Sequence, residues 1–300
     1  MSASWFSQID LSRLAPPAVV EALDFESILG AMLSDLRTRD PAFSAITEAD
    51  PAYKILEVAA YRELLIRQRI NDASRSVMLA YATGSDLDHI AANYGVSRLI
   101  ISPANSRTVP PTPAVMETDE ALRARTALSL EGHTTAGSRA SYVFHALSAS
   151  GDVRDVGVAS LVPGTVNVRV LSRSETGRAS AETLAAVRDA LNAEDVRPLC
   201  DTVDVQSAEI AEYRIAAVLT VFNGAGQAEV KAAAEASARA YANEQKRLGR
   251  DITRSGVFAA LHRAGVQNVT LMEPAQDIVN DWKRAPHCTE IRVSVGGIGD

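Results

Sequence analysis

The best candidate for a ligand-binding motif is the segment Gly224-Ala225-Gly226-Gln227-Ala228-Glu229. It follows a predicted strand and precedes a predicted helix, as the phosphate-binding turn of dinucleotide-binding proteins does. That fingerprint needs a third small residue for close packing of helix and strand, and here Glu229 stands at that place. A carboxylate there also repels a pyrophosphate. The segment therefore favours a glycine turn that leads into a helix, with a nucleotide-binding α/β enzyme as the alternative.

The histidines lack the spacing of a local zinc site, because none belongs to an HExxH motif or to a pair four residues apart. They are His89, His133, His145, His262 and His287. His145 and His262 lie in amphipathic helical patterns, where ordinary packing explains them. His287 is next to Cys288, so in an extended chain the two side chains point to opposite sides. The pattern indicates no metal site.

Two other signatures of catalysis are also missing from the sequence. It contains no GxSxG nucleophile turn and no GxxxxGK[ST] phosphate loop. Acidic pairs such as Asp86 with Asp88, or Asp201 with Asp204, are explained by helix caps and turns. We therefore expect no catalytic residue, no metal and no cofactor, and we predict that the chain is not an enzyme.

The composition is that of an ordinary globular protein, with 47% hydrophobic and 22% charged residues in a chain of 300. The net charge of −7 argues against a nucleic-acid-binding protein, which normally has a basic surplus. The strongest basic cluster is interleaved with acidic residues, which indicates a salt-bridged helix face. It consists of Arg62, Arg67, Arg69 and Arg75, among Glu57, Glu63 and Asp72.

The two cysteines, Cys200 and Cys288, do not form a CxxC motif, and their number fits synthesis in a reducing cytoplasm. The first fifteen residues lack the basic and apolar regions of a secretory signal. No apolar stretch approaches the ~20 residues that a membrane helix needs. We expect no membrane insertion, and export only as part of an assembled particle.

Residues 53–82 are predicted to form a long helix, because no glycine or proline interrupts them and apolar residues recur at helical spacing. Asp50 and Pro51 suit its cap and first turn, and Gly84 suits a left-handed end. The apolar positions are too many for one narrow stripe, so more than one side should be packed. The helix is either a core helix of one domain or one that docks against helices of other subunits. For docking, the candidate interface residues are Ile55, Val58, Tyr61, Leu65, Arg69, Ile70 and Val77.

Residues 102–115 are rich in proline, serine and threonine, which predicts an extended, semi-stiff linker and a domain boundary. Beyond it, helices are expected at residues 118–130, 138–148 and 180–192, a hairpin at 153–171 turning at Pro163-Gly164, and a strand at 202–205. The last third is expected to contain strands at 213–222, 266–272 and 289–295, with helices at 227–246 and 254–264.

The predicted fold class is α+β, with an N-terminal helical region followed by two small α+β modules. The predicted division is a helical region at residues 1–101, the linker at 102–115, a first module at 116–206 and a second at 207–300. The modules share a faint echo of helix, glycine and strand, around Gly151 in the first and Gly265 in the second.

Several segments, in order along residues 9–297, resemble the baseplate assembly protein J family of P2-like contractile phages and related bacteriocins. The opening block is Ile9-Asp10-Leu11-Ser12, Pro16-Pro17, Val19-Val20-Glu21, Leu23-Asp24-Phe25-Glu26 and Ile28-Leu29. The most distinctive block is Ala60-Tyr61-Arg62-Glu63-Leu64, Arg67-Gln68-Arg69-Ile70-Asn71 and Val77-Met78-Leu79-Ala80-Tyr81-Ala82, ending in Gly84 and Asp86-Leu87-Asp88. The later blocks include Met116-Glu117-Thr118-Asp119-Glu120, Ser129-Leu130-Glu131-Gly132, Tyr142-Val143-Phe144-His145-Ala146-Leu147, Val196-Arg197-Pro198-Leu199, Leu248-Gly249-Arg250-Asp251-Ile252 and Ala260-Leu261-His262. Each motif is weak alone, and their common order makes the resemblance specific.

The resemblance implies a structural wedge subunit of a contractile tail or tail-like bacteriocin, assembled in the host cytoplasm and located in the tail baseplate of the virion. It implies a ring of such subunits around the tail hub, and partners similar to protein I and to the sheath-initiator protein W. The family has no known catalytic residues. A scaffold unrelated to phage is the remaining alternative. On the family reading, we expect the free chain to expose part of residues 51–82.

Overall fold

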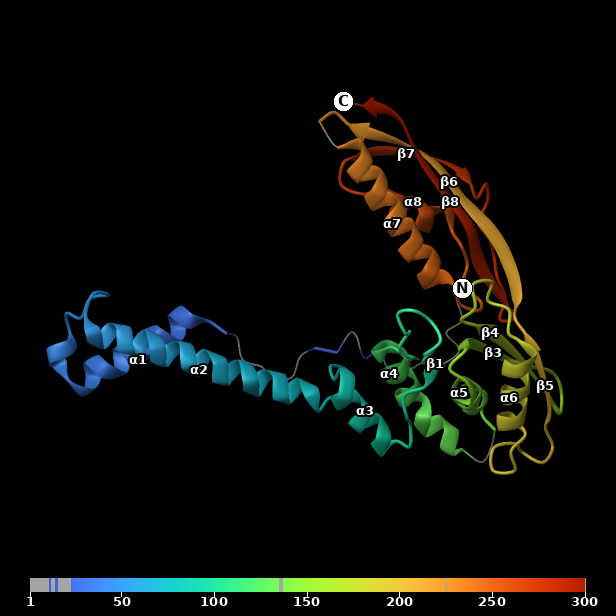
Figure 1. Ribbon diagram of the computed structural model, residues 1–300, viewed down its shortest axis with the longest axis horizontal. Coiled ribbons are helices and arrows are strands. Elements are labelled where there is room, and N and C mark those ends of the chain that lie inside the picture. Colours follow the sequence, from blue (N-terminus) through green and yellow to red (C-terminus); the bar gives the residue numbers. More distant parts are fainter. Residues whose placement is uncertain (1–10, 12–13, 16–22, 135–136, 225, 300) are drawn as a thin grey trace. The chain divides into compact units, whose positions relative to one another are not determined.

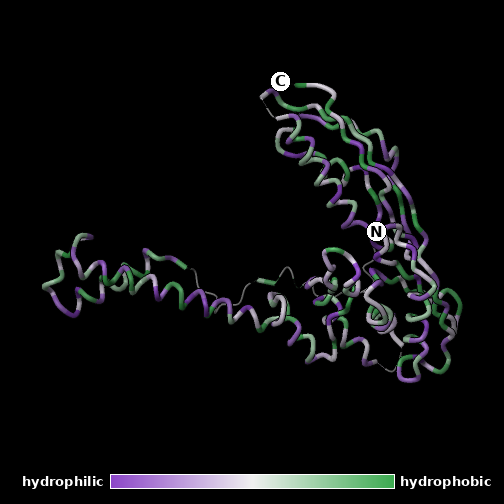
Figure 2. Tube along the Cα trace, viewed as in Figure 1, coloured by the Kyte–Doolittle hydropathy of each residue, from purple (hydrophilic) through white to green (hydrophobic). Residues whose placement is uncertain are grey.

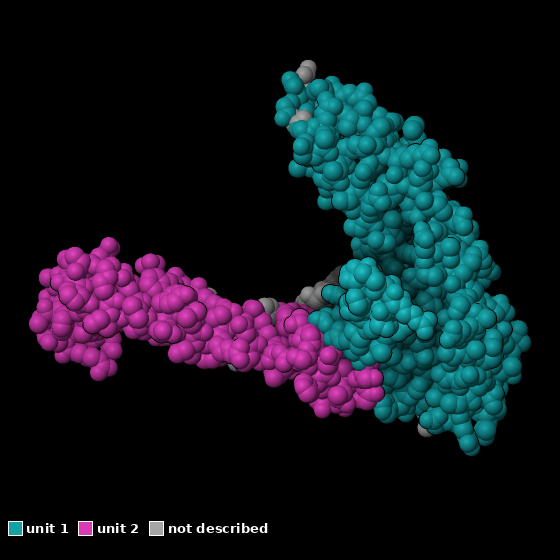
Figure 3. Space-filling model, viewed as in Figure 1, with its two compact units in different colours: residues 1–7, 98–300 teal, residues 8–97 magenta. Residues whose placement is uncertain are grey.

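The computed structural model describes residues 11, 14–15, 23–134, 137–224 and 226–299 (Figure 1). The chain divides into two compact units, a helical unit of residues 8–97 and an α+β unit that contains residues 98–300 (Figure 3). Most of the opening resemblance block, at residues 9–21, lies outside the described residues, as does Ala225 of the glycine segment.

The helical unit contains two consecutive helices that pack against each other, α1 (Phe25–Arg39) and α2 (Pro51–Ser76). A 3₁₀ turn (Pro41–Phe43) follows α1, and a shorter helix, α3 (Gly84–Asn93), follows α2. Asp24 caps α1 by accepting a hydrogen bond from the backbone N–H of Glu26 at 3.2 Å. The core lies between α1 and the N-terminal half of α2. Its buried members are Ile28, Leu29, Leu33 and Ala60.

The long helix is confirmed, but it ends at Ser76 and not near residue 82. The hydroxyls of Ser74 and Ser76 bond back to helix carbonyls at 2.8 and 3.0 Å, which competes with continuation of the helix. Gly84 has the predicted left-handed φ of +53°, but it is the first residue of α3. Asp50 is the N-cap residue of α2, as predicted, but its carboxylate accepts hydrogen bonds from the N–H and hydroxyl of Thr47 and none from the N–H groups of α2.

The two ends of the proline-rich segment 102–115 lie next to each other. Strands β1 (Ile100–Ser102) and β2 (Val115–Met116) pair antiparallel at its two ends, and Asn105 bridges to Thr112 within it. The boundary between the two compact units falls before it, between residues 97 and 98. The segment is therefore a closed hairpin loop, which differs from the extended connection that its composition predicted.

The first module contains helices α4 (Asp119–Leu128), α5 (Arg139–Ala149) and α6 (Ala181–Leu191), with strands β3 (Val153–Val162), β4 (Thr165–Ser172) and β5 (Thr202–Ser207). β3 and β4 form the predicted hairpin, and Gly164 in its turn has a φ of +76°. α6 then crosses over so that β5 pairs parallel with β4. The core between sheet and helices includes Val168, Val170, Val187 and Leu191.

The second module contains a three-stranded sheet in the order β7-β6-β8, covered on one face by helices (Figure 1). Its elements are β6 (Glu209–Phe222), α7 (Gln227–Gln245), α8 (Arg254–Leu261), β7 (Val266–Glu273) and β8 (Arg284–Gly299). β6 is the central strand, antiparallel to β7 and parallel to β8. Ile215, Leu219 and Val221 on β6 pack against Ala234 on α7 and Val257 on α8.

The two modules are joined by an almost continuous strand, because only Ala208 separates β5 from β6. Side chains fasten the junction. The guanidinium of Arg154 donates to the carbonyls of Asn243 and Lys246, at the end of α7, at 2.6 and 3.0 Å. The partly buried side chain of Asp155 accepts a hydrogen bond from the N–H of Leu248 at 2.8 Å through its carboxylate. These contacts hold the sheet of one module against the end of a helix of the other.

The predicted α+β class is confirmed, with a helical region followed by two small sheet-and-helix modules. The sequence echo corresponds to α5–β3 and to α8–β7; in both pairs a helix is followed by an antiparallel edge strand of the sheet. The order of the central strand differs, because β4 follows its edge strand whereas β6 precedes it. Gly151 and Gly265 also serve different purposes: a Cβ on Gly151 would collide with the backbone of Ile100, whereas Gly265 has a φ of +90°.

A candidate docking face on the long helix

All seven residues predicted to form a subunit interface have exposed side chains. Six lie on α2, and Val77 follows its last residue. The exposed fractions are large for apolar side chains, at 69% for Ile55, 53% for Ile70 and 73% for Val77. Such exposure along one helix is unusual in a folded soluble chain and is typical of surfaces that contact other proteins. The expectation that residues 51–82 are partly exposed is confirmed.

Local interactions in α2 explain why this sequence forms a long helix. Pro51 occupies the first turn, where its missing N–H costs no hydrogen bond. Side-chain pairs then support the helix along its length. They are Lys54 with Glu57 at 2.9 Å, Glu63 with Arg67 at 2.6 Å, and Gln68 with Asp72 at 2.7 Å.

α2 is apolar on two sides, of which α1 covers one. Tyr53, Leu56 and Leu64 pack around the buried Ala60 in the core with α1. Successive residues lie about 100° apart around a helix, so Ile55 points about 140° away from Ala60. Figure 2 shows that hydrophobic positions continue along α2, interleaved with hydrophilic ones. One helix therefore has both a buried and an exposed apolar side.

We call the exposed side the α2 stripe. It comprises Ile55, Val58, Arg62, Leu65, Ile66, Arg69, Ile70, Ala73 and Val77, all exposed. Ile55, Ile66 and Val77 are spaced by eleven residues, which is three helical turns within about 20°. Tyr61 lies at the edge of the stripe and is 53% exposed. The spacing gives the stripe the geometry that packs against another helix.

Ile66 belongs to the stripe, although the predicted interface did not include it. It is 60% exposed and lies between Leu65 and Ile70. The signal was available, because the interval of eleven residues from Ile55 points directly to it. The sequence predicted a salt-bridged helix face that contains Arg62, Arg67, Arg69 and Arg75. Of these, Arg67 forms the predicted kind of ion pair, with Glu63. No ion pair or hydrogen bond of Arg62 or Arg69 is found within the described part of the chain.

The glycine segment has a geometry that disfavours a phosphate. Gly224 has a φ of +83°, and Gly226 precedes the first turn of α7. The carboxylate of Glu229 folds back over Gly226, where a Cβ on that glycine would collide with it. A pyrophosphate at this helix N-terminus would meet that negative charge. Gly224 thus has the left-handed φ expected in a glycine turn, and an acidic group lies where the ligand would bind.

The histidines and cysteines are dispersed. His133 and His145 make hydrogen bonds to the backbone carbonyls of Ser129 and Gly132, at 2.9 and 3.2 Å. Cys200 is exposed, and burial raises the pKa of the Cys288 thiol. Among the described residues, no three His, Cys, Asp or Glu side chains come together as a metal site. No described helix combines the length and apolar character that crossing a membrane requires.

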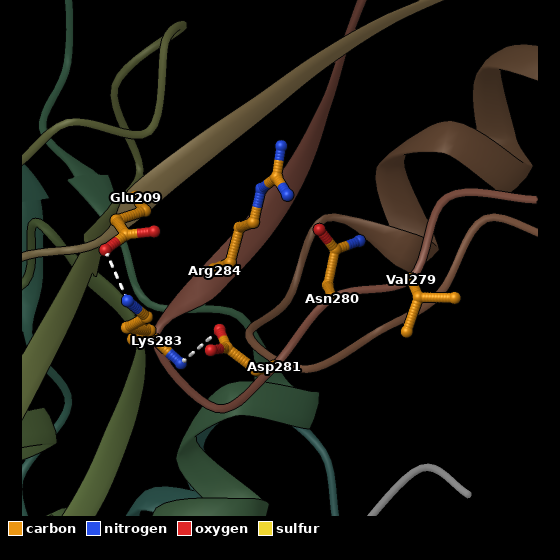
Figure 4. Close-up of a pocket in the computed structure, with 6 residues that line it drawn as sticks. All are labelled: Glu209, Val279, Asn280, Asp281, Lys283 and Arg284. Atoms are coloured by element: carbon orange, nitrogen blue, oxygen red, sulfur yellow. Dashed lines mark hydrogen bonds and ion pairs between the residues drawn. The ribbon is translucent and has the colours of Figure 1, made fainter.

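A shallow hollow of about 350 Å³ lies at the start of β6 and β8 (Figure 4). Its lining residues are Glu209, Val279, Asn280, Asp281, Lys283 and Arg284. Lys283 bonds to Glu209 at 2.9 Å, which lowers the pKa of Glu209 and raises that of Lys283. Both groups therefore stay charged near neutral pH, and neither is poised to transfer a proton.

Family models match three successive parts of the chain. They are the baseplate J-like N-terminal domain at residues 48–105, the central domain at 134–207 and the C-terminal domain at 213–294. These matches define a structural component of a contractile-tail baseplate, and the chain belongs to the baseplate J-like family. The resemblance drawn from the sequence blocks is confirmed.

Baseplate protein J of Escherichia phage P2 is 50% identical to this chain over an alignment of 296 residues, and the match covers 96% of this chain and 98% of that protein. A chain in the cryo-EM structure of the anti-feeding prophage (AFP) baseplate, 6-fold symmetrised, is 14% identical with a TM-score of 0.41. That match covers 59% of this chain and 44% of the other, so this chain spans less than half the length of its structural neighbour.

Proposed function

We propose that the chain is a wedge subunit of the baseplate that docks through the α2 stripe onto helices of neighbouring baseplate subunits. It acts by assembly and not by catalysis. In this proposal the subunits form a ring around the tail hub, and the partners are proteins similar to protein I and to the sheath-initiator protein W. The chain is assembled in the host cytoplasm and remains in the virion tail. Family membership and 50% identity to P2 baseplate protein J support it.

The single observation that carries the docking proposal is the exposed apolar stripe on a helix whose opposite side is already packed. The six large apolar side chains of the stripe are each 43–73% exposed. Covering their exposed parts contributes roughly 7 kcal/mol before the costs of association. Those costs are several kcal/mol, so a lasting contact needs further favourable interactions with the partner.

The test is co-expression of the tagged chain with the protein I-like and protein W-like products of the same tail. The double variant Ile66→Asp/Ile70→Asp places carboxylates in the stripe and leaves the core with α1 intact. We expect it to lose partner capture while its helix content and melting temperature stay within error of the wild type. Val109→Asp is the matched control, because Val109 is 99% exposed and lies outside α2. Undiminished capture by Ile66→Asp/Ile70→Asp refutes docking through this face.

A further inference from the structure

The charges on α2 are distributed unequally between the stripe and the rest of the helix. Every carboxylate of α2 is engaged by a neighbour on the same helix: Glu57 by Lys54, Glu63 by Arg67 and Asp72 by Gln68. None of the three belongs to the stripe. Arg62 and Arg69 do belong to it, and both are exposed. The stripe therefore carries two positive charges and no negative one, on a chain whose net charge is −7.

Any partner that covers the stripe must supply groups that pair with the guanidinium groups of these two arginines. Arg62 and Arg69 lie among Val58, Leu65, Ile66 and Ile70, so a helix that covers those apolar side chains also removes water from the guanidinium groups. A guanidinium buried without a partner is strongly unfavourable. Two carboxylates on the partner can compensate through bidentate hydrogen bonds. Seven residues separate the arginines, which is two turns and about 10 Å along the axis.

A second copy of the same stripe does not meet this condition. Whether two copies pack parallel or antiparallel, each stripe presents arginines and apolar side chains only. The carboxylates of α2 lie beyond the stripe and are already paired. Like charges in a desolvated contact are repulsive and disfavour association. A pair of stripes alone thus leaves four guanidinium groups without counter-charges.

We propose that the partner of the α2 stripe is an amphipathic helix of a different protein, with an apolar face that carries two carboxylates about two turns apart. One carboxylate pairs with Arg62 and the other with Arg69. This inference rests on the docking proposed above and adds the chemistry of the partner. The arginines select an acidic helix and oppose pairing of two identical stripes, while the apolar side chains supply most of the buried surface.

The test is tail assembly by charge-reversal variants, followed by selection of suppressors. Arg62→Glu/Arg69→Glu should reduce the yield of assembled tails at least a hundredfold. Arg75→Glu is the matched control, because Arg75 is exposed on the same helix outside the stripe; it should stay within threefold of the wild type. Suppressors of the double reversal should replace an Asp or Glu by Lys, Arg or a neutral residue in another tail protein.

Circular dichroism and thermal melting show whether the double reversal folds, and Arg62→Gln/Arg69→Gln supplies a milder change that should reduce assembly at least tenfold. Normal assembly by both arginine variants, or suppressors that map to this chain's own stripe, overturns the acidic partner. If Ile66→Asp/Ile70→Asp still blocks assembly in that case, docking through the stripe stands and only the partner chemistry fails. If those apolar variants also assemble normally, the proposed function fails with it.

Discussion

The buried ion pair between Glu117 and Arg125 fastens the start of the α+β unit. Its closest atoms are 2.6 Å apart, and the side chains are only 4% and 5% exposed. The carboxylate of Glu117 also accepts from the backbone N–H of Leu99 at 3.1 Å. Glu117→Gln preserves the shape of the side chain and removes its charge. The buried guanidinium of Arg125 then loses the negative charge of Glu117, and breaking a buried ion pair in this way costs about 3–5 kcal/mol.

That loss is large beside a typical total stability of about 5–15 kcal/mol. For a unit of this size, it corresponds to a fall in melting temperature of roughly 6–20 °C. Thermal and urea unfolding of the whole chain, followed by far-ultraviolet circular dichroism, measure the change. Glu235→Gln is the control, because Glu235 pairs with Lys231 at 3.6 Å on the surface of the same unit. It should cost less than ~1 kcal/mol.

A second variant shows whether the loss of stability comes from the buried charge or from lost packing. Glu117→Leu/Arg125→Met removes both charges and fills similar volume, so it should recover most of the stability that Glu117→Gln loses. A free energy of unfolding for Glu117→Gln within 1 kcal/mol of the wild type would refute this role of the ion pair, because removing the charge of Glu117 beside a buried guanidinium would then have no measurable cost.

Three further predictions concern the α+β unit. Ser180 accepts the N–H of Thr183 at 3.1 Å as the cap of α6, so Ser180→Ala should lower the free energy of unfolding by about 1 kcal/mol in urea. The Nζ of Lys246 donates hydrogen bonds to the carbonyls of Ser174 and Glu175 across the module junction, at 3.1 and 2.5 Å. Lys246→Met should therefore lower the free energy of unfolding in urea by about 1–3 kcal/mol, and an unchanged unfolding midpoint would contradict that role. Burial raises the pKa of Asp155 above 3.8, so the folded chain holds this proton more tightly than the unfolded one. Relative to Asp155→Asn, the wild type should therefore gain stability as the pH falls through the folded pKa toward 3.8 and lose it as the pH rises, and a difference that does not change with pH would contradict the shift.

Much of the local structure of the α+β unit could be predicted from the sequence because single residues determine it. Ser138 and Ser180 mark helix starts as caps, and Gly164 marks the hairpin turn. The length of β8 could not be predicted in this way. It begins at Arg284, five residues before the predicted strand, because its first half pairs with β6 about 75 residues away. Such pairing leaves little local signal.

In the α2 stripe, too, one part could be predicted from the sequence and another could not. Helical spacing was enough to select exposed residues on α2, because a second apolar side exceeds what one neighbour can cover. The charge pattern needed the structure. Interleaved charges in sequence suggested salt bridges throughout, but only side chains three or four residues apart can meet on a helix, and their rotamers decide which do. Arg67 meets Glu63, whereas Arg62 and Arg69 point outward with the stripe.

In the proposed function, another protein of the baseplate covers the α2 stripe. The most direct measurement is maleimide labelling of Ile66→Cys in a Cys200→Ser background, which removes the exposed native thiol. The free chain, intact tails and denatured tails are compared, with Val109→Cys as a second exposed position in the free chain. We expect rapid labelling at position 66 in the free chain and in denatured tails, with at least tenfold slower labelling in intact tails. Equal labelling rates in the free chain and in intact tails would contradict it.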